Sequence, residues 1–387
     1  MKRILIVNNN MYIGGVQRSL LNLLNEMHSK YDITLLLFYP HGELLNSVPH
    51  DVRIIYPRSP IKYWGMSRMH CSNIFCRFSR AFWAGMTRIF GIRTSFELAS
   101  IFQKKLNGFD AAISFLHSGS PHVFYGGCNE FVLRCVDAKK KISFLHCDYG
   151  KINADCEYNK RLYHAFDSIA ACSEGCKREF LKIIPELENN VSVVHNFQNY
   201  RQIREASAAA SVSLPNGTLN ILTVARFGKE KGILRAIEAV GHLGKAAGAI
   251  CYNIIGAGAE YDEAVKMVKD LNLSGTVHLL GEISNPYGYM RASDLLLIPS
   301  ISEAAPMVIG EAACLGLPVL STETSSAEEM VNATGYGWVC ANSVDGLCNG
   351  LKMTISDPEA LSRRRDALRT MTFDNLTAEK EFSELMD

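Results

Sequence analysis

The sequence lacks several patterns that would assign a function or a compartment at once. Its twelve cysteines form no C-x-x-C pair, and no Cys/His set has the spacing of a structural zinc site. No apolar run approaches the roughly 18–20 residues that span a bilayer, and the first one, residues 3–7, is too short for the core of a secretion signal. Lys and Arg total 40 against 39 Asp and Glu, so charge does not point to nucleic acid. We therefore expect a cytoplasmic protein with free thiols and no transmembrane helix.

Common phosphate-binding and metal-binding motifs are also missing. The early glycine pair Gly14-Gly15 fits neither G-x-G-x-x-G nor a Walker loop. The chain contains no D-x-D, a carboxylate pair that can hold Mg²⁺ or Mn²⁺. The expectation is that the protein needs no metal and no other cofactor.

What the sequence does contain is an alternation of short apolar runs with helix-period segments. This alternation predicts βαβ units around parallel sheets, and 387 residues with 48% hydrophobic content suggest two domains. The expected strands are residues 3–7, 32–38, 52–56, 111–116, 140–146, 168–172 and 191–196 in the first half, and 219–226, 250–256, 276–281, 294–300, 318–322 and 337–340 in the second.

The predicted fold is α/β, with two Rossmann-like, doubly wound domains that face an interdomain cleft. Residues 1–198 form the first domain, and the Ala-, Ser-, Gly- and Pro-rich residues 199–218 form a linker. Residues 219–370 form the second domain, and residues 371–387 a C-terminal helix that could pack back on the first. Ligands of such sheets bind outside the carboxyl ends of the strands, so the cleft is the expected site.

The glycine pair Gly14-Gly15 opens a predicted helix directly after the first strand. Glycines at a helix N-terminus let backbone N–H groups approach an anion, which the helix dipole also favours. The alternative is a tight turn between strand and helix that needs a positive φ.

Two further loops follow strands of the second half. In "VARFGKEKG" (224–232), Arg226 and Lys231 could converge on a diphosphate, although two basic loop residues are also typical of a solvated surface. In "NIIGAGAE" (253–260), Gly256 and Gly258 could let a flat ligand ring approach, or could simply form a structural turn.

The stretch "SEAAPMVIGEAACLGLPVLST" (302–322) holds two carboxylates around a predicted helix that starts at Pro306 and stops at Gly316. Glu303 and Glu311 are just over two helical turns apart, on the order of 10 Å. That spacing suits two grips on one ligand better than a shared proton, and carboxylates accept paired hydrogen bonds from the vicinal hydroxyls of ribose or a hexose. The alternative is an exposed cap and a solvated helix residue. The apolar neighbours argue for burial, where an unpaired Glu311 would be costly.

Two histidines stand at the ends of predicted strands in the first half. His146, in "SFLHCDYG", could bond to a donor sugar or phosphate. His117, in "SFLHSGS", is the competing candidate, and either could instead be a satisfied structural residue.

In this order, the motifs resemble those of the retaining family 4 glycosyltransferases, which have the GT-B fold and an E-x7-E donor motif. The resemblance runs along nearly the whole chain, and its most specific element is the 302–322 stretch. The other matching segments are Gly14-Gly15-Val16, "FLHCDYG", "DSIAACSEGCKREF", "VSVVHNFQN" and "VARFGKEKG".

The resemblance implies a role for each matching position. The first domain would bind the acceptor and the second the nucleotide sugar, with Glu303, His146, Arg226 and Lys231 as the catalytic set. Further donor contacts would come from Gly14, Gly15, Gly256, Glu311 and the backbone amides of Ala305, Met307 and Val308. Within this set, Arg226 and Lys231 would hold the diphosphate. Glu311 would bind the ribose, Glu303 the sugar hydroxyls and Gly15 the phosphate.

The implied reaction moves a sugar, with retention, from a UDP-sugar to a cell-surface polysaccharide or glycolipid precursor. The chain departs from the family pattern at Gln17, at Ala225 and in "EAAP" (303–306). Two alternatives stay open. A non-hydrolysing nucleotide-sugar epimerase would need acid/base residues around the sugar, and a non-catalytic sugar-binding protein would be expected to carry an export signal.

A basic, aromatic stretch stands in the first half. From Arg58 to Arg93 there are seven Lys or Arg and no acid. Residues 72–91 place seven large apolar residues on one helical face: Phe75, Phe78, Phe82, Trp83, Met86, Ile89 and Phe90. Arg77, Arg80 and Arg88 fall on the opposite face. This pattern predicts peripheral contact with an anionic membrane on its cytoplasmic side. The alternatives are a core helix with a basic outer face and a wall of the acceptor pocket.

Overall fold

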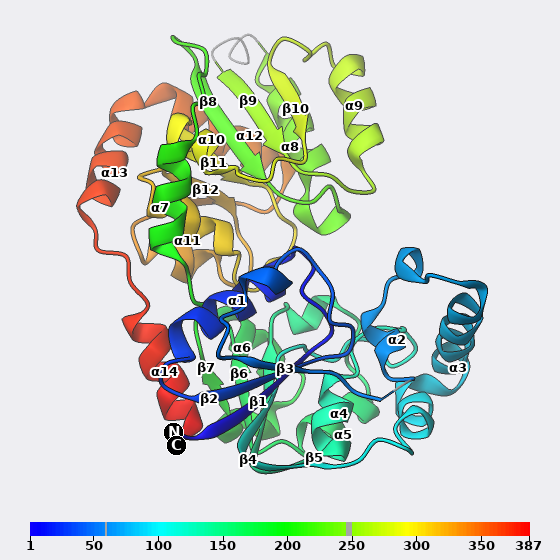
Figure 1. The fold of residues 1–387 in the computed structure, drawn as a ribbon. Coiled ribbons are helices and arrows are strands. Elements are labelled where there is room, and N and C mark those ends of the chain that lie inside the picture. The colour runs from blue at the N-terminus through cyan, green and yellow to red at the C-terminus, as the bar shows by residue number, and fades with distance from the viewer. Residues whose placement is uncertain (59, 245–249) are drawn as a thin grey trace. The chain divides into compact units, whose positions relative to one another are not determined.

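The protein is described here from a computed structural model, which covers residues 1–58, 60–244 and 250–387. The chain divides into two compact units: unit 1 comprises Met1–Phe197 and Asn375–Asp387, and unit 2 comprises Gln198–Asp374. Each unit is built around one parallel sheet flanked by helices (Figure 1). The predicted α/β class with two Rossmann-like domains is confirmed.

Unit 1 holds a seven-stranded sheet in its described residues, with the strand order β3-β2-β1-β4-β5-β6-β7. Every strand pair in it is parallel. Its strands are β1 (Arg3–Asn8), β2 (Asp32–Leu37), β3 (Arg53–Ile55), β4 (Leu106–Ser114), β5 (Val136–Leu145), β6 (Ser168–Ala171) and β7 (Val191–Val193). Its helices are α1 (Gly15–Met27), α2 (Lys62–Gly65), α3 (Ile74–Ala99), α4 (Cys128–Cys135), α5 (Glu157–Tyr163), α6 (Glu174–Leu181) and α14 (Leu376–Met386).

Most strands of unit 1 match the predicted ones because their apolar runs are buried, as expected for a parallel sheet. The edge strand β3 is the least buried, with Arg53 and Ile54 exposed. In β1, the side chains from Ile4 to Val7 are completely buried.

Strand β5 begins at Val136, four residues before its predicted start. Strand β4 begins five residues before its predicted start, at Leu106. Its first residues are polar or exposed and carry an irregular register with β5 between Leu106 and Phe109. The apolar pattern that predicted the strand is therefore absent there.

The last helix, α14, belongs to unit 1 although it is the end of the chain. Its apolar stripe packs into the unit 1 core, where Phe382 is fully buried. The ammonium groups of Lys2 and Lys140 donate to the carbonyls of Met386 and Leu385, each over 2.8 Å, and so satisfy the end of the helix. Both chain ends therefore lie together (Figure 1).

Unit 2 has a six-stranded parallel sheet in its described residues, ordered β10-β9-β8-β11-β12-β13. The order repeats that of the first six strands of unit 1. Its strands are β8 (Leu219–Val224), β9 (Ile250–Ile255), β10 (Val277–Gly281), β11 (Leu295–Ile298), β12 (Val319–Thr322) and β13 (Gly337–Cys340). Its helices are α7 (Tyr200–Ala209), α8 (Ile233–His242), α9 (Tyr261–Asp270), α10 (Tyr287–Ala292), α11 (Met307–Ala313), α12 (Val344–Ser356) and α13 (Pro358–Thr370), with a π-helical turn at Glu328–Asn332.

The predicted linker at 199–218 is wrong for its first half. Residues 200–209 form α7, which belongs to unit 2 and packs against α10. Ile203 of α7 is buried in the unit 2 core. The segment has few large apolar residues, but alanine is the best helix former, so one buried face is enough to fix a short helix.

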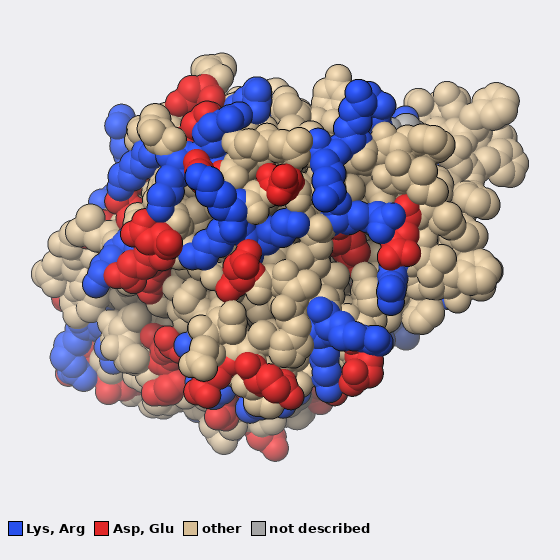
Figure 2. All heavy atoms as spheres, turned by 90° about the horizontal axis from the view of Figure 1, so that it is seen from below, with Lys and Arg blue, Asp and Glu red and all other residues tan. Residues whose placement is uncertain are grey.

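Helix α3 contains the predicted aromatic helix of residues 72–91 and extends it to Ala99. Gly91 breaks it with a φ of 79°, a conformation that favours glycine. The outer face exposes large apolar side chains, with Phe75, Phe78 and Phe82 between 59% and 80% exposed. The alternative of a core helix with a basic outer face is therefore wrong. Seen from below, the right-hand end of the molecule, on the side where Figure 1 draws α3, shows mainly uncharged side chains (Figure 2).

The predicted opposite face of three arginines is only partly correct. Arg77 and Arg88 are exposed, but Arg80 is half-buried. Its guanidinium donates to the carbonyl of Met66 over 2.8 Å and lies over the ring of Phe124. In the described part of the chain, no helix is long and apolar enough to cross a membrane.

Candidate active site

The strongest candidate site lies in unit 2, where the sheet order reverses between β8 and β11. The chain leaves the carboxyl end of β8 through Arg226 and that of β11 through Ser300 and Glu303. In doubly wound sheets such a reversal opens a crevice outside the strand ends, which is where ligands bind. The two predicted catalytic loops of unit 2 therefore meet at the expected edge.

Lys231 and Glu303 form an ion pair at this edge, with 2.6 Å between Nζ and Oε1. Both side chains are largely shielded, at 21% and 12% exposure. Ser300 donates its hydroxyl to the same carboxylate oxygen over 2.8 Å, and Ser325 donates to the Glu303 carbonyl over 2.7 Å. Because both charges are partly removed from water, each depends on the other for compensation.

Arg226 lies on the same loop as Lys231 but is much more accessible. Its guanidinium pairs with Glu230 over 3.1 Å, and the two side chains are 77% and 46% exposed. An exposed ion pair of this kind contributes about 0–1 kcal/mol. Arg226 can therefore leave Glu230 for an anionic ligand at little cost.

Glycines bring these loops together by close backbone approach. Gly232 ends the turn at Lys231 with a φ of 62°, and an added Cβ would lie 2.2 Å from the carbonyl oxygen of Pro299. At Gly256 and Gly258 an added Cβ would meet the carbonyl oxygens of Ala225 and Phe227, at 1.9 and 2.5 Å. The structural alternative therefore accounts for both glycines after β9. They make room for the Arg226 loop, and the donor contact of Gly256 stays a prediction.

Glu311 lies in α11 and is 8% exposed, so the expected burial is confirmed. The hydroxyl of Tyr287 in α10 lies 3.5 Å from its Oε1 atom. The helix begins at Met307 rather than at Pro306, because Pro306 adopts an extended conformation and acts as the N-cap. Gly316 terminates the helix as predicted, with a φ of 75°.

The amides predicted to contact the donor lie at the start of the same helix. Met307 and Val308 are in its first turn, and Ala305 precedes the cap. Backbone N–H groups in a first turn have no partner within the helix.

In unit 1, the glycine pair also opens a helix, since Gly14 is the N-cap of α1. The alternative that the pair needs a positive φ is wrong, because Gly14 has a φ of −175° and Gly15 is not among the positive-φ residues. An added Cβ at Gly15 would meet nothing within 4 Å. The local fold therefore does not itself require glycine at Gly15.

His146 and His117 follow the adjacent strands β5 and β4, so the structure brings the two competing candidates together. The His146 ring packs against the rings of Phe115 and Phe144, with centroids 4.6 and 5.7 Å away. Burial lowers the pKa of His146 to about 3, with a further decrease from His117. Burial also lowers the pKa of His117 to about 4. Both rings are neutral at pH 7.

Each of these imidazoles keeps a buried nitrogen without a hydrogen-bond partner among the described residues, Nδ1 of His117 and Nε2 of His146. A buried polar atom without a partner is uncommon in folded proteins. A neutral ring with such an atom can donate a hydrogen bond to a ligand or accept one from it.

The family comparison concerns mainly unit 2. Residues 188–371 match the model of the family described as "Glycosyl transferases group 1". The matched range contains Arg226, Lys231, Glu303 and Glu311, so all four predicted ionic residues of unit 2 lie inside it.

Two curated relatives show similarity over part of their sequences. The amylovoran biosynthesis glycosyltransferase AmsK of Erwinia amylovora is 31% identical over 153 residues, which is 37% of this chain and 37% of the relative. A Campylobacter jejuni enzyme is 28% identical over 228 residues, 57% of this chain and 61% of the relative. Its name is N-acetylgalactosamine-N,N'-diacetylbacillosaminyl-diphospho-undecaprenol 4-alpha-N-acetylgalactosaminyltransferase. Among the first matched relatives, the chain spans just over a third of each one's length.

Solved structures match over the full chain. Anabaena Alr3699/HepE in complex with UDP and glucose superposes with a TM-score of 0.69, at 16% identity, over 100% of this chain and 99% of that one. A glycosyltransferase from Rickettsia africae gives 0.68 at 16% identity, over 100% and 97%. The fold is therefore that of glycosyltransferases with two Rossmann-like domains, the GT-B fold.

The structure also adds residues that the sequence prediction missed. Ser300 and Ser325 hold Glu303, and Tyr287 lies beside Glu311. Ser300 could have been found, because it ends a predicted strand at the ligand-binding edge. Tyr287 and Ser325 come from other segments, and no sequence spacing connects them to a glutamate. In the described residues, no group of three or more His, Cys, Asp or Glu side chains is placed to hold a metal ion.

Proposed function

We propose that the protein is a retaining, metal-independent glycosyltransferase that takes a sugar from a UDP-sugar. The observation that carries the proposal is the Lys231–Glu303 ion pair at the carboxyl edge of the unit 2 sheet, with the exposed Arg226 on the same loop as Lys231. It lies inside the range that matches the group 1 glycosyl transferases. A UDP donor is supported by the UDP complexes of proteins with the same fold.

In the proposed reaction, an acceptor hydroxyl oxygen bonds to the anomeric carbon of the donor on the face from which UDP leaves. The bond between that carbon and the diphosphate oxygen breaks, its electron pair stays on UDP, and the hydroxyl proton departs with UDP. The main electrostatic demand is negative charge on the leaving diphosphate. Arg226 and Lys231 supply fixed positive charge for it, which is the chemical basis for expecting no metal.

The two glutamates take different parts in the proposal. Glu311, buried in α11, accepts hydrogen bonds from the ribose hydroxyls of UDP. Glu303 is bonded to Lys231 and accepts from the hydroxyls of the transferred sugar. The ion pair keeps the Lys231 ammonium in place before the donor arrives, so little reorganisation is needed during transfer. His146 lies near the sugar in this proposal and acts as a neutral imidazole.

The proposed acceptor is a glycan or a lipid-linked sugar in surface polysaccharide synthesis, reached from the cytoplasmic face of a membrane. The names of two relatives, one for amylovoran biosynthesis and one for a diphospho-undecaprenol substrate, support this class. The exposed aromatic residues of α3 support peripheral contact with an anionic membrane surface through residues 72–91.

A thermal-shift panel tests the donor part of the proposal. The full chain is heated with UDP, GDP, ADP and their sugars, with and without EDTA. We expect UDP and UDP-sugars to raise the melting temperature, and EDTA to leave that rise unchanged. Absence of stabilisation by every nucleotide would reject the donor site. Loss of the effect in EDTA would reject metal independence.

A second assay separates transfer from epimerisation. The UDP-sugar that stabilises best is incubated without acceptor, and its sugar is identified by NMR. Interconversion of the UDP-sugar with its epimer would favour the epimerase. An unchanged sugar that is transferred only when acceptor is added supports the glycosyltransferase, and the anomeric coupling of the product tests retention.

A further inference from the structure

A cavity of about 510 Å³ lies in unit 1, outside the carboxyl end of β2. Its walls are residues 39–41 after that strand, helix α2, the turn Arg68–His70 and the first turns of α3. The carboxyl edge of a parallel sheet is where ligands of such folds bind. None of the residues predicted to bind the donor lines this cavity.

The cavity wall combines aromatic rings with cationic and neutral hydrogen-bond donors. Tyr39 and His41 are stacked with their ring centroids 3.9 Å apart and an interplanar angle of 3°. His70 and Lys62 face the same space, and no Asp or Glu lines it. Flat ring faces pack well against the apolar face of a sugar, while Lys62 favours an anion. The lining therefore fits a sugar that carries a phosphate.

The segment of the chain around the cavity is positively charged, like Lys62 in its wall. Between Asp51 and Glu97 the sequence has eight Lys or Arg and no acid. Two of these arginines, Arg77 and Arg88, are exposed on α3, and Arg80 is fixed beside the cavity by the Met66 carbonyl. This local field attracts a polyanionic head group and an anionic bilayer surface.

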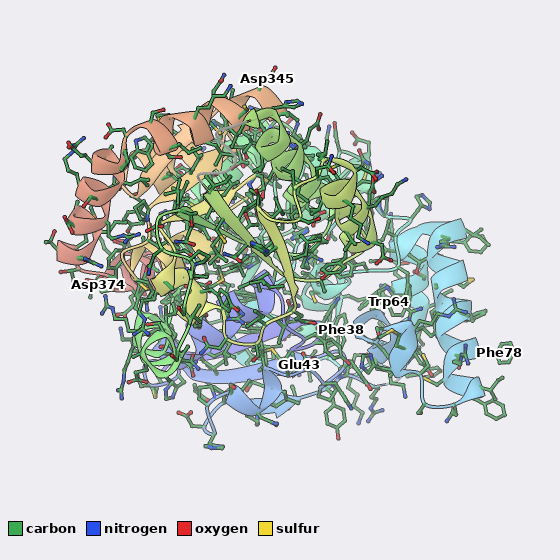
Figure 3. All side chains as sticks on the ribbon, turned by 90° about the horizontal axis from the view of Figure 1, so that it is seen from above. Phe38, Glu43, Trp64, Phe78, Asp345 and Asp374 are labelled. Atoms are coloured by element: carbon green, nitrogen blue, oxygen red, sulfur yellow. The ribbon has the colours of Figure 1, made fainter. Side chains whose placement is uncertain are left out.

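An exposed aromatic ridge, defined as Phe75, Phe78, Phe82, Ile89 and Phe90 of α3, begins at the cavity. Phe75 lines the cavity and is also 80% exposed, and Phe78 and Phe82 follow on the same face of the next turns. Phe78 points away from the rest of unit 1, whereas Trp64 of α2 lies on the inner side of α3 (Figure 3) and packs against Trp83. A contiguous exposed apolar surface beside a polar pocket marks contact with an amphiphile.

Hydrogen bonds and a ring contact join the segments around the cavity to the glycine loop between β1 and α1. Asn10 donates its side-chain amide to the carbonyl of Gly65 over 2.9 Å, and the Met11 amide donates to the carbonyl of His41 over 2.9 Å. Tyr12 of this loop stacks on His70, with 4.9 Å between centroids. A ligand head in the cavity is therefore held next to the loop that is predicted to contact the donor phosphate.

We propose that this cavity binds the phosphate-bearing sugar head of a lipid-linked acceptor, and that the aromatic ridge lies in the lipid surface beside it. The proposal rests on the proposed function, because it assigns the acceptor side of the same transfer. It commits to one occupant, an amphiphile with an anionic sugar-phosphate head. The lining of the cavity contains Lys62 and no Asp or Glu, and the cavity is continuous with the ridge. Both features favour that occupant.

Vesicle binding by the full chain tests the two parts separately. Phosphatidylcholine vesicles are prepared with a minor fraction of an undecaprenyl phosphate that carries glucose on its phosphate, which serves as the probe, or with phosphatidylglycerol at the same surface charge. The cavity variant is Lys62→Gln with His70→Gln, and its control is Lys352→Gln on the exposed face of α12. The ridge variant is Phe78→Ser with Phe82→Ser, and its control is Met353→Ser, another exposed apolar residue.

We expect wild type to prefer the undecaprenyl phosphate vesicles, and the cavity variant to lose that preference by about tenfold while still binding both vesicles. The ridge variant should lose at least about tenfold on both, since two phenylalanines leave the lipid. Wild type without a preference, or a cavity variant that keeps it, would overturn the cavity assignment. A ridge variant that binds vesicles like wild type would overturn the lipid contact and leave a protein partner as the occupant.

UDP titration of the same preparations separates this proposal from the proposed function. Unchanged UDP affinity together with an unchanged cooperative melting curve shows that the variants are folded and that a loss of vesicle binding is specific. If UDP does not bind wild type while the vesicle selectivity is present, the donor proposal fails and the cavity assignment stands. If UDP binds and the vesicle selectivity is absent, the cavity assignment fails and the donor proposal stands.

Discussion

The two units share a strand order but differ in the chemistry at the carboxyl edge of their sheets. In unit 2 that edge holds a shielded ion pair, Lys231 with Glu303, next to exposed Arg226. In unit 1 the corresponding edge holds the neutral rings of His117 and His146 and a cavity with stacked aromatic rings. The same strand order therefore carries an ion pair at this edge in unit 2 and neutral imidazoles with stacked rings in unit 1.

The difference between the two edges also explains which parts of the fold and of the candidate sites can be predicted from the sequence. Most strands in the described residues follow from apolar runs, because a parallel sheet covered on both faces leaves this simple pattern. The ionic edge of unit 2 is readable because Glu303 and Glu311 are close in sequence and unusual in apolar surroundings. The cavity of unit 1 is not readable, since Tyr39, Lys62 and Phe75 come from three segments that only the fold brings together.

Some contacts were missed for similar physical reasons. The Lys231–Glu303 pair joins residues 72 positions apart, and neither local spacing nor burial predicts it. The linker prediction failed because composition alone does not separate an alanine-rich helix such as α7 from a loop. The sequence leaves both a ligand contact and a structural turn open for Gly256, and the close approach of the backbone of residue 225 supports the turn, while the donor contact stays a prediction.

The largest expected effect comes from removing the cation of the unit 2 edge. Lys231→Met should lower turnover at least about 100-fold, because the leaving diphosphate loses a fixed positive charge. Steady-state kinetics measure this loss. The double variant Lys231→Met with Glu303→Gln tests whether Lys231 only neutralises Glu303. We expect its UDP affinity to stay weakened. Recovery of wild-type UDP affinity in the double variant would contradict a direct role in holding the diphosphate.

Substitutions of Glu311 and Glu303 should change the affinity for UDP differently. Glu311→Gln should raise the Kd for UDP about tenfold, the size expected for losing a charged hydrogen bond to ribose. Glu303→Gln should leave UDP affinity equal or tighter, because it frees the Lys231 ammonium, while it lowers turnover. Calorimetric titration of both variants, with kinetics alongside, makes the comparison. Equal weakening of UDP binding by both would show that the division of roles is wrong.

The neutral histidines of unit 1 should give a pH-dependent stability effect. The pKa of His117 is lowered to about 4 in the folded protein, so between pH 6.5 and 4 the unfolded chain binds a proton that the folded chain does not. Stability is therefore lost as pH falls through this window, by about 1–2 kcal/mol at pH 5 for this histidine. His117→Gln should show a correspondingly smaller drop in unfolding free energy between pH 7 and pH 5.

Urea unfolding at the two pH values measures this drop. The matched control is His50→Gln, which replaces an exposed histidine of the same unit. If His117→Gln loses as much stability as wild type and the control, the account of a buried neutral ring fails.

The smallest expected effect concerns the exposed arginines of α3. Arg77→Gln with Arg88→Gln should weaken binding to phosphatidylglycerol vesicles by several-fold to about thirtyfold, at about 1 kcal/mol per charge near an anionic surface. The control Lys266→Gln with Lys269→Gln removes two exposed charges from α9 of unit 2. Co-sedimentation at low and high salt measures both. Equal binding by the two double variants would contradict an oriented contact through α3.

The most direct test of the contrast between the two units is calorimetric titration of the full chain with UDP in the presence of EDTA. The account predicts saturable binding at one site, weakened by Lys231→Met and by Glu311→Gln and unchanged by His117→Gln. No binding of UDP, or equal weakening by the unit 1 and unit 2 variants, would contradict the assignment of the donor charge to the edge of unit 2.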